Sequence, residues 1–237
     1  MNVLIACEES QEVCKAFRER GHRAFSCDIQ EPSGGHPEWH ILGDCLPLIN
    51  GRCEFKTMDG KYHKQPDKWD LIIAHPPCTY LSNVSNRMFS LSHASPESVV
   101  ERWRKRAEAA VFFMMFVSAD CEKVCIENPV GFMNSAYKKA DCIIHPYYFA
   151  RSTEDKENYC QKRTCLWLKG LKSLERTTIL PKPDPLYICQ GEKTKGKHIG
   201  WCEGMRNISG GQTERAKARS KTFTGIARAM AEQWGGI

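Results

Sequence analysis

Two short motifs, each directly after an apolar run, carry the residues that could do chemistry. The run Trp69–Ala74 leads through a His-Pro-Pro segment to Cys78, and the run Val124–Ile126 leads into Glu127. A cysteine thiolate is a nucleophile, and the two prolines would hold its sulfur in one place. An acid that ends a strand either donates a proton, with its pKa raised by burial, or caps the next turn. The sequence leaves open whether His75 tunes the thiol or only packs.

A further acid lies where an α/β fold would hold a ligand. The first residues predict a strand over Val3–Ala6, an amphipathic helix, and a second strand over Ala24–Cys27 that runs into Asp28. An acid at this position contacts a ribose in α/β nucleotide-binding folds. The first turn reads CEESQE and is not rich in glycine, so a ligand without a phosphate beside this turn fits better.

These motifs need one α/β domain with a mostly parallel sheet to position them. The apolar run before His75 is typical of a strand that is buried on both faces, and such sheets carry their chemistry at the carboxyl ends of the strands. Residues 49–67 predict a hairpin or an exposed excursion. Ser95, Pro96 and Glu97 predict the start of a long helix. We expect its apolar stripe to pack in the core: Val99, Val100, Trp103, Ala107, Ala110, Val111, Met114 and Met115.

The composition fits an ordinary folded protein. A chain of 237 residues with 41% hydrophobic residues can bury one core, which argues against a disordered or repeat protein. The longest apolar stretch, Val111–Val117, is far short of the roughly 20 residues of a membrane helix. The N-terminal sequence lacks the pattern of a signal peptide, so we expect a cytoplasmic protein with no membrane partner.

Thirteen cysteines without any CxxC pair predict thiols in a reducing compartment and disfavour a structural metal site. Cys189, His198 and Cys202 form the one loose candidate cluster. Charge divides the chain: residues 1–150 carry 17 basic and 19 acidic groups, and residues 151–237 carry 17 and 9. The last third therefore has a net charge of +8, as expected if it approaches a polyanion such as DNA.

Taken in chain order, the motifs resemble the cytosine-5 DNA methyltransferases, in the small form found in phage genomes. That family carries a PC loop, an ENV loop, a QxRxR segment, a TxRExARLQxFP segment and a glycine-led final helix. The matching residues are Pro77-Cys78, Glu127-Asn128-Pro129-Val130, Gln161-Lys162-Arg163, then Thr213, Arg215, Ala218, Arg219 and Phe223, and the stretch from Gly225. Here Cys165 replaces the second arginine of QxRxR, and only residues 171–212 stand where relatives place a large target-recognition domain.

The resemblance implies a Rossmann-like, S-adenosylmethionine-dependent methyltransferase fold with a very small target-recognition insertion. The catalytic core would cover residues 1–170, the recognition segment 171–212, and a C-terminal helix that returns to the core 213–237. S-adenosylmethionine would be the cofactor and DNA the partner, with no metal, and we expect a monomer in the cytoplasm of a bacterial host. The catalytic residues would be Cys78, Glu127 and Arg163. The cofactor contacts would be Ala6, Cys7, Glu8, Ser10, Asp28, Ile29, Asp44 and Pro76. The DNA contacts would be Asn128, Lys162, Arg163, Lys195, Lys197, Arg215 and Arg219.

In the implied mechanism, the Cys78 thiolate adds to carbon 6 of a cytosine that has been flipped out of the duplex. Glu127 hydrogen-bonds ring nitrogen 3 and the amino group and supplies a proton there. Carbon 5 takes the methyl group, and loss of its proton with expulsion of the thiol restores the ring. Asp28 would bind the cofactor ribose, Asp44 the adenine, and Arg163 a phosphate.

Three alternatives stay open at this stage. An amino methyltransferase acting on adenine or cytosine has a PPY or PPW loop, and here cysteine stands where its stacking aromatic residue would be. The same carbon-5 chemistry could act on a free pyrimidine nucleotide or on RNA. A protein that keeps the fold and binds DNA without catalysis is the third alternative.

Overall fold

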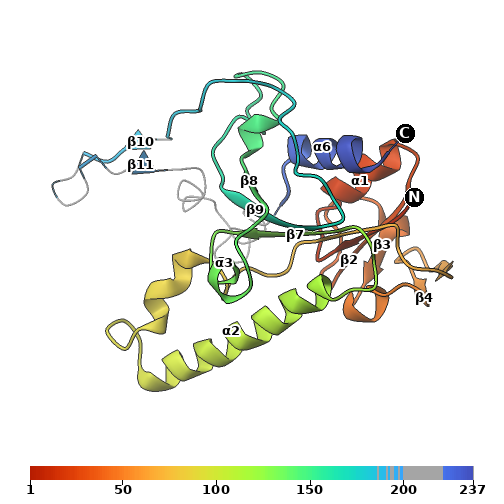
Figure 1. Cartoon of the computed structure of the whole chain (residues 1–237), viewed down its shortest axis with the longest axis horizontal. Coiled ribbons are helices and arrows are strands. Elements are labelled where there is room, and N and C mark those ends of the chain that lie inside the picture. Colours follow the sequence, from red (N-terminus) through yellow and green to blue (C-terminus); the bar gives the residue numbers. More distant parts are fainter. Residues whose placement is uncertain (186, 191, 193–194, 197, 200–220, 237) are drawn as a thin grey trace.

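The computed structural model describes residues 1–185, 187–190, 192, 195–196, 198–199 and 221–236. Its central feature is one seven-stranded sheet between two layers of helices (Figure 1). The elements in chain order are β1 (Asn2–Ala6), α1 (Glu12–Glu19), β2 (Arg23–Asp28), η1 (Pro37–Trp39), β3 (His40–Leu42), η2 (Leu46–Leu48), β4 (Cys53–Lys56), β5 (Tyr62–Gln65), β6 (Leu71–Ala74), η3 (Asn83–Phe89), α2 (Pro96–Val117), β7 (Val124–Pro129), α3 (Met133–Ala136), β8 (Cys142–Ile144), η4 (Pro146–Tyr148), β9 (Thr164–Lys169), β10 (Tyr187–Ile188), β11 (His198–Ile199) and α6 (Thr224–Trp234).

The sheet has the strand order β3-β2-β1-β6-β7-β9-β8. β3, β2, β1, β6 and β7 are parallel, whereas β9 runs antiparallel to both β7 and β8. From β1 the chain moves to β2 and β3 on one side, and β6 and β7 lie on the other side. The direction of winding therefore reverses between β1 and β6. This confirms the predicted α/β class with a mostly parallel central sheet.

Alternating side chains of the strands feed two cores, one on each face of the sheet. Leu4 and Ile72 belong to the core that also contains Phe113 of α2. Val3 and Ile73 belong to the opposite core, which contains apolar residues of α1 and α6. All four strand residues have no exposed surface, as expected for central strands of a sheet covered on both sides. In Figure 1, α2 lies below the sheet, and α1 and α6 lie together above it.

The chain after β9 stays close to the C-terminal helix. The Trp234 indole N–H donates to the Lys172 carbonyl oxygen at 3.0 Å, and Glu175 and Gln233 exchange two hydrogen bonds. Leu174 is buried in the core beside α6. The first residues of the expected recognition segment thus pack on the core. Residues 213–220, at the start of the expected C-terminal unit, lie outside the described residues.

The long helix α2 begins where the sequence predicts, because the Ser95 hydroxyl accepts the Ser98 N–H and Pro96 occupies its first turn. The predicted inner stripe is wrong for most of its positions, although Val99 is buried and Ala110 packs, partly buried, against the core. Val100 is 69% exposed, Val111 64% and Trp103 48%, and Ala107, Met114 and Met115 are also exposed. The buried positions of this helix are Val99, Arg106, Phe113 and Phe116. The predicted helical spacing is confirmed, but the face of the helix that meets the sheet is rotated from the predicted one. Arg106, Phe113 and Phe116 define that inner face.

None of the helices that the structure describes combines the length and the apolar character needed to cross a bilayer. Within the same residues, no group of three or more His, Cys, Asp or Glu side chains is arranged to hold a metal ion. The loose cluster expected from the sequence includes Cys202, which lies outside the described part of the chain.

The assignment of the α2 faces predicts a difference between two truncations on the same helix. Phe113→Ala should lower the free energy of unfolding by about 3–5 kcal/mol, because Phe113 is fully buried and its removal leaves a cavity. Val111→Ala should change it by less than about 0.5 kcal/mol, because its side chain is mostly in solvent. Urea denaturation of both variants tests this, and equal losses would contradict the assignment.

Candidate active site

The carboxyl ends of β1, β6 and β7 bring the predicted chemical residues to one edge of the sheet. In open α/β sheets, ligands bind outside this edge at the point where the strand order reverses. Here that point lies between β1 and β6. The turn after β1 carries Cys7 and Glu8, the loop after β6 carries His75 and Cys78, and Glu127 lies on β7. The fold therefore brings to one edge three residues that are far apart in the sequence: Glu8 precedes Cys78 by about 70 residues, and Glu127 follows Cys78 by about 50.

Cys78 is the exposed cysteine among the twelve that the structure describes. Several others are unsuited to nucleophilic chemistry, because burial raises the pKa of the Cys14, Cys27 and Cys125 thiols far above its usual value. Cys7 lies 3.9 Å from Cys45, sulfur to sulfur. That contact, together with burial, also raises the pKa of the Cys7 thiol. Exposure thus distinguishes Cys78 from the cysteines that serve as small apolar side chains.

Three separate parts of the fold hold the loop that carries Cys78. The Asn128 side-chain amide on β7 donates to the Pro76 carbonyl oxygen at 2.7 Å. The Arg106 Nε on α2 donates to the Tyr80 carbonyl oxygen at 2.7 Å. The Phe132 N–H donates to the Leu81 carbonyl oxygen, also at 2.7 Å. Because the loop is anchored before and after Cys78, the position of the sulfur is set by the core and not by the loop alone.

Arg106 is a functional side chain that the sequence did not reveal. It is 5% exposed, its guanidinium carbon lies 3.4 Å from the centre of the Phe89 ring, and it also donates to the Asn86 side chain at 2.7 Å. Burial lowers the pKa of Arg106, and the nearby Arg102 charge adds to this effect. A basic residue inside a long charged helix offers no sequence signal that separates it from its exposed neighbours.

Glu127 is paired with a histidine at this edge. His75 Nδ1 lies 3.1 Å from Glu127 Oε2, and the side chains are 7% and 17% exposed. Burial acts to raise the pKa of Glu127, but the His75 hydrogen bond and the positive charges of Lys162 and His75 outweigh it. The pKa of Glu127 is therefore below its usual value, and the resting group is a carboxylate. The sequence left open whether Glu127 is a proton donor with a raised pKa or a cap of the next turn. In the structure it is instead an ionised hydrogen-bond partner of His75.

The Glu8 side chain binds the backbone N–H groups at the start of helix α1. Its two carboxylate oxygens accept the N–H groups of Val13 and Cys14 at 2.6 and 3.2 Å. Burial raises the pKa of Glu8 to about 7, against the opposing effects of His75 and these two hydrogen bonds. The anion-binding end of the helix is thus filled by the protein itself. Glu8, which is expected as a cofactor contact, also organises the turn through these hydrogen bonds.

The other expected cofactor contacts divide by exposure. Asp28 is half-buried at the end of β2 and accepts the Gln30 N–H at 2.9 Å; burial raises its pKa. Ile29 is 79% exposed, and Asp44 is exposed and accepts the Leu46 N–H. Ala6, Ser10 and Pro76 are buried, so they can offer only backbone groups or a contact surface.

The expected DNA contacts are placed less completely. Lys162 lies close enough for its charge to act on Glu127, and its amine is 5.4 Å from the centre of the Phe223 ring. Arg163 is exposed just before β9, where its charge acts on His145 and Cys165. Lys195 is exposed in the turn between β10 and β11. Asn128 is buried, and its amide holds the Cys78 loop. Three further expected contacts lie outside the described residues: Lys197, Arg215 and Arg219.

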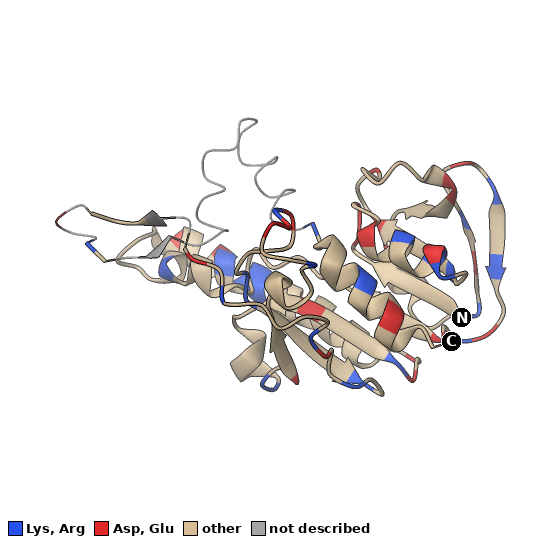
Figure 2. Ribbon diagram, turned by 90° about the horizontal axis from the view of Figure 1, so that it is seen from above, with Lys and Arg blue, Asp and Glu red and all other residues tan. Residues whose placement is uncertain are grey.

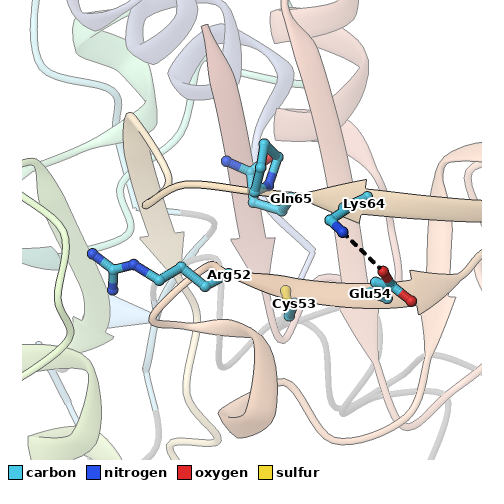
Figure 3. A pocket seen from close by; sticks show the side chains of 6 residues that line it. Arg52, Cys53, Glu54, Lys64 and Gln65 are labelled. Carbon is cyan, nitrogen blue, oxygen red and sulfur yellow. Dashed lines mark ion pairs between the residues drawn. The ribbon is translucent and has the colours of Figure 1, made fainter.

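A surface hollow of about 320 Å³ lies elsewhere on the molecule (Figure 3). The β4–β5 hairpin forms it, and its Lys64 and Glu54 side chains pair with each other at 3.3 Å. Arg23, the first residue of β2, bonds Gln65 beside it. The hollow is therefore at the amino-terminal edge of the sheet, opposite to the chemical residues. Figure 2 shows basic and acidic segments interspersed along the described ribbon.

The buried Glu8 predicts a specific pH dependence of stability. Its pKa in the folded protein, about 7, is above the unfolded value, so ionisation destabilises the fold progressively between about pH 4.5 and 7. Glu8→Gln removes this effect. The free energy of unfolding of the variant relative to wild type should rise by on the order of 3 kcal/mol from pH 5 to pH 8. Urea denaturation at each pH measures it, and parallel pH curves for the two proteins would contradict it.

The close approach of Gly131 to the Cys78 loop predicts an unusual cost for alanine. A β-carbon at this position would overlap the Leu81 carbonyl oxygen. Gly131→Ala should lower the free energy of unfolding by about 1–3 kcal/mol, because backbone and not a flexible side chain must move. Gly60→Ala is the control, since only Lys56 Cε at 3.8 Å is near and the cost, about 1 kcal/mol, comes from its φ of 89°. A neutral or stabilising Gly131→Ala in thermal denaturation would refute the close approach.

Comparison with known proteins adds no relative to this picture: no protein-family model matches the chain, and no curated protein is similar to it in sequence.

Proposed function

We propose that this protein transfers a methyl group from S-adenosylmethionine to carbon 5 of cytosine in DNA, through a covalent bond to Cys78. One observation carries the proposal. The exposed thiol of Cys78 follows β6, and the carboxylate of Glu127 lies on the neighbouring parallel strand β7, beside the point where the strand order reverses. A nucleophile next to a proton-handling acid is the pair that attack on carbon 6 of a cytosine requires.

The residues of the β1 edge fit S-adenosylmethionine better than a dinucleotide. The start of α1 has its amides filled by Glu8, which leaves no site there for a pyrophosphate. S-adenosylmethionine has no phosphate and needs none. Asp28, half-buried at the end of β2, would hold the ribose hydroxyls, and the exposed side chain of Ile29 would cover the adenine. When bound, this group supplies a methyl group on a positively charged sulfur.

Cys78 performs the first and last steps. Its thiolate forms the bond to carbon 6, which makes carbon 5 electron-rich enough to take the methyl group. The anchored loop supports this role, because Asn128, Arg106 and the Phe132 amide hold the backbone on both sides of the sulfur. A fixed nucleophile avoids the entropy that a mobile one would lose on attack.

Glu127 recognises the base. Its carboxylate can accept a hydrogen bond from the exocyclic amino group of cytosine, which a thymine lacks. Attack at carbon 6 puts negative charge on ring nitrogen 3, and a proton shared with Glu127 neutralises it. The surroundings support an electrostatic role for this residue, because Lys162 and His75 already stabilise its charge.

The DNA backbone is the source of the polyanion that the charged C-terminal third would meet. Arg163 and Lys195 are exposed, and Arg163 precedes the strand that pairs with β7. A basic side chain at this edge can hold a phosphate beside a flipped nucleotide. Recognition of the DNA sequence would be relaxed or short, because only residues 171–212 stand where the resembling family places a large target-recognition domain.

Replacement of the nucleophile tests the proposal. Cys78→Ser should lower methyl transfer from labelled S-adenosylmethionine to cytosine-containing duplex DNA by at least a factor of about 10³, because a serine hydroxyl is not ionised near neutral pH. Cys53→Ser, on the hairpin at the opposite edge, is the control and should keep wild-type activity.

A trapping experiment separates the chemistry from its alternatives. DNA that contains 5-fluorocytosine cannot lose its substituent at carbon 5, so the wild-type protein should form an adduct at Cys78 that mass spectrometry detects. Full activity of Cys78→Ser would instead indicate direct attack by an exocyclic amine. Cofactor binding with neither adduct nor methyl transfer on any DNA would refute the proposed function.

A further inference from the structure

His75 is placed by the register of the sheet between two acids. Ile73 pairs with Cys125 and Ala74 pairs with Ile126, so His75 and Glu127 are the next pair along β6 and β7. The His75 N–H donates to the Ala6 carbonyl oxygen at 2.9 Å, which ties the same residue to the end of β1. His75 directly follows the central strand β6. It is therefore flanked by Glu8, which comes after β1, and by Glu127, which lies on β7.

The contacts of the imidazole are uneven. Nδ1 lies 3.1 Å from Glu127 Oε2, and because a carboxylate only accepts, Nδ1 carries the proton of this hydrogen bond. Nε2 is buried and has no hydrogen-bond partner among the described residues. The whole side chain is 7% exposed.

The groups around His75 form a cluster of titratable side chains. Glu8 from the β1–α1 turn interacts with His75 electrostatically, and Lys162 faces Glu127 from the segment before β9. The thiols of Cys125 and Cys165 also face Glu127, but burial raises the pKa of both, so they stay neutral. Among the described residues, two acids and one lysine therefore surround His75.

Glu127 alone cannot supply the proton that the proposed reaction needs. Its resting form is a carboxylate, because His75 and Lys162 lower its pKa against the effect of burial. Attack of Cys78 on carbon 6 nevertheless requires a proton at ring nitrogen 3 of the base. Among the described residues, the group that contacts the Glu127 carboxylate and can hold a proton for it is His75, through Nδ1.

We propose that His75 is a positioning residue that stores the proton for Glu127 and delivers it when Cys78 attacks the base. This inference rests on the proposed function. As the sulfur–carbon 6 bond forms, a doubly protonated His75 passes its Nδ1 proton to the Glu127 carboxylate and becomes a neutral imidazole with its proton on Nε2, and the carboxyl group protonates nitrogen 3. After carbon 5 has taken the methyl group, its proton leaves to solvent and the sulfur–carbon bond breaks. Nitrogen 3 then returns the stored proton along the same path, so His75 and Glu127 recover their starting forms.

His75→Asn separates proton storage from simple support. The asparagine amide nitrogen can take the place of Nδ1 and donate to Glu127, but it cannot give up a proton. The variant should bind DNA with nearly unchanged KM and lose at least a factor of about 10² in kcat. The wild-type kcat should fall as pH rises, and the kcat of the variant should not fall in this way.

Two controls decide what a result means. Wild type must methylate DNA or trap 5-fluorocytosine, and failure to do either overturns the proposed function together with the relay that rests on it. If wild type is active and His75→Asn lies within about threefold of it with the same pH profile, only the relay is refuted.

A measurement without DNA covers the case in which the variant folds poorly. In ¹⁵N-histidine-labelled protein, the signal missing from His75→Asn identifies His75 among the eight histidines. We expect the ¹⁵N shifts to show a proton on Nδ1 of His75 in wild type, and this signal to change in Glu127→Gln, which removes the carboxylate that accepts this hydrogen bond. A His75 whose Nδ1 carries no proton would overturn the proposal.

Discussion

The parallel pairing of β6 with β7 is the constraint on which the chemical edge depends. Its register makes His75 and Glu127 neighbours, and it also brings the Asn128 amide to the Pro76 carbonyl oxygen two residues before Cys78. A slip of one residue would send these side chains to the opposite face of the sheet. The nucleophile, the carboxylate and their supports are therefore positioned by backbone hydrogen bonds in the middle of the core. Those bonds are among the last parts of a fold to open.

Charged side chains of the protein itself also organise the carboxyl edge of the sheet, where Cys78 lies. Glu8 fills the start of α1, so that end of the helix no longer attracts an outside anion. His75 and Lys162 keep Glu127 ionised in spite of its burial. Arg106 donates hydrogen bonds to Tyr80 and Asn86, which lie in the segment that follows Cys78. Each of these buried charges costs desolvation, and each is compensated by contacts that also fix the geometry of the edge.

The sequence predicted the elements that have a simple local cause. Apolar runs identified β1, β6 and β7, the Ser95 cap marked the start of α2, and the C-terminal pattern identified α6. It also placed Cys78 after β6, but it expected the next strand to end at Ile126, whereas β7 continues through Glu127 to Pro129. It could not predict what depends on register or phase. The pairing of His75 with Glu127 needs the alignment of two strands 50 residues apart, and the inner face of α2 depends on which of two apolar stripes meets the sheet. Arg106 is part of that second face, and its role was missed for the same reason.

The turn after β1 bends without glycine. Cys7 and Gln11 adopt left-handed backbone conformations, with φ of 59° and 58°, which side chains other than glycine adopt at a cost of roughly 1 kcal/mol or more each. The Gln11 side chain offsets that cost through hydrogen bonds to Ser26 and to the His36 carbonyl oxygen. Sequence patterns that require glycine at such a turn would not recognise a turn of this kind, because its left-handed positions are occupied by residues with side chains.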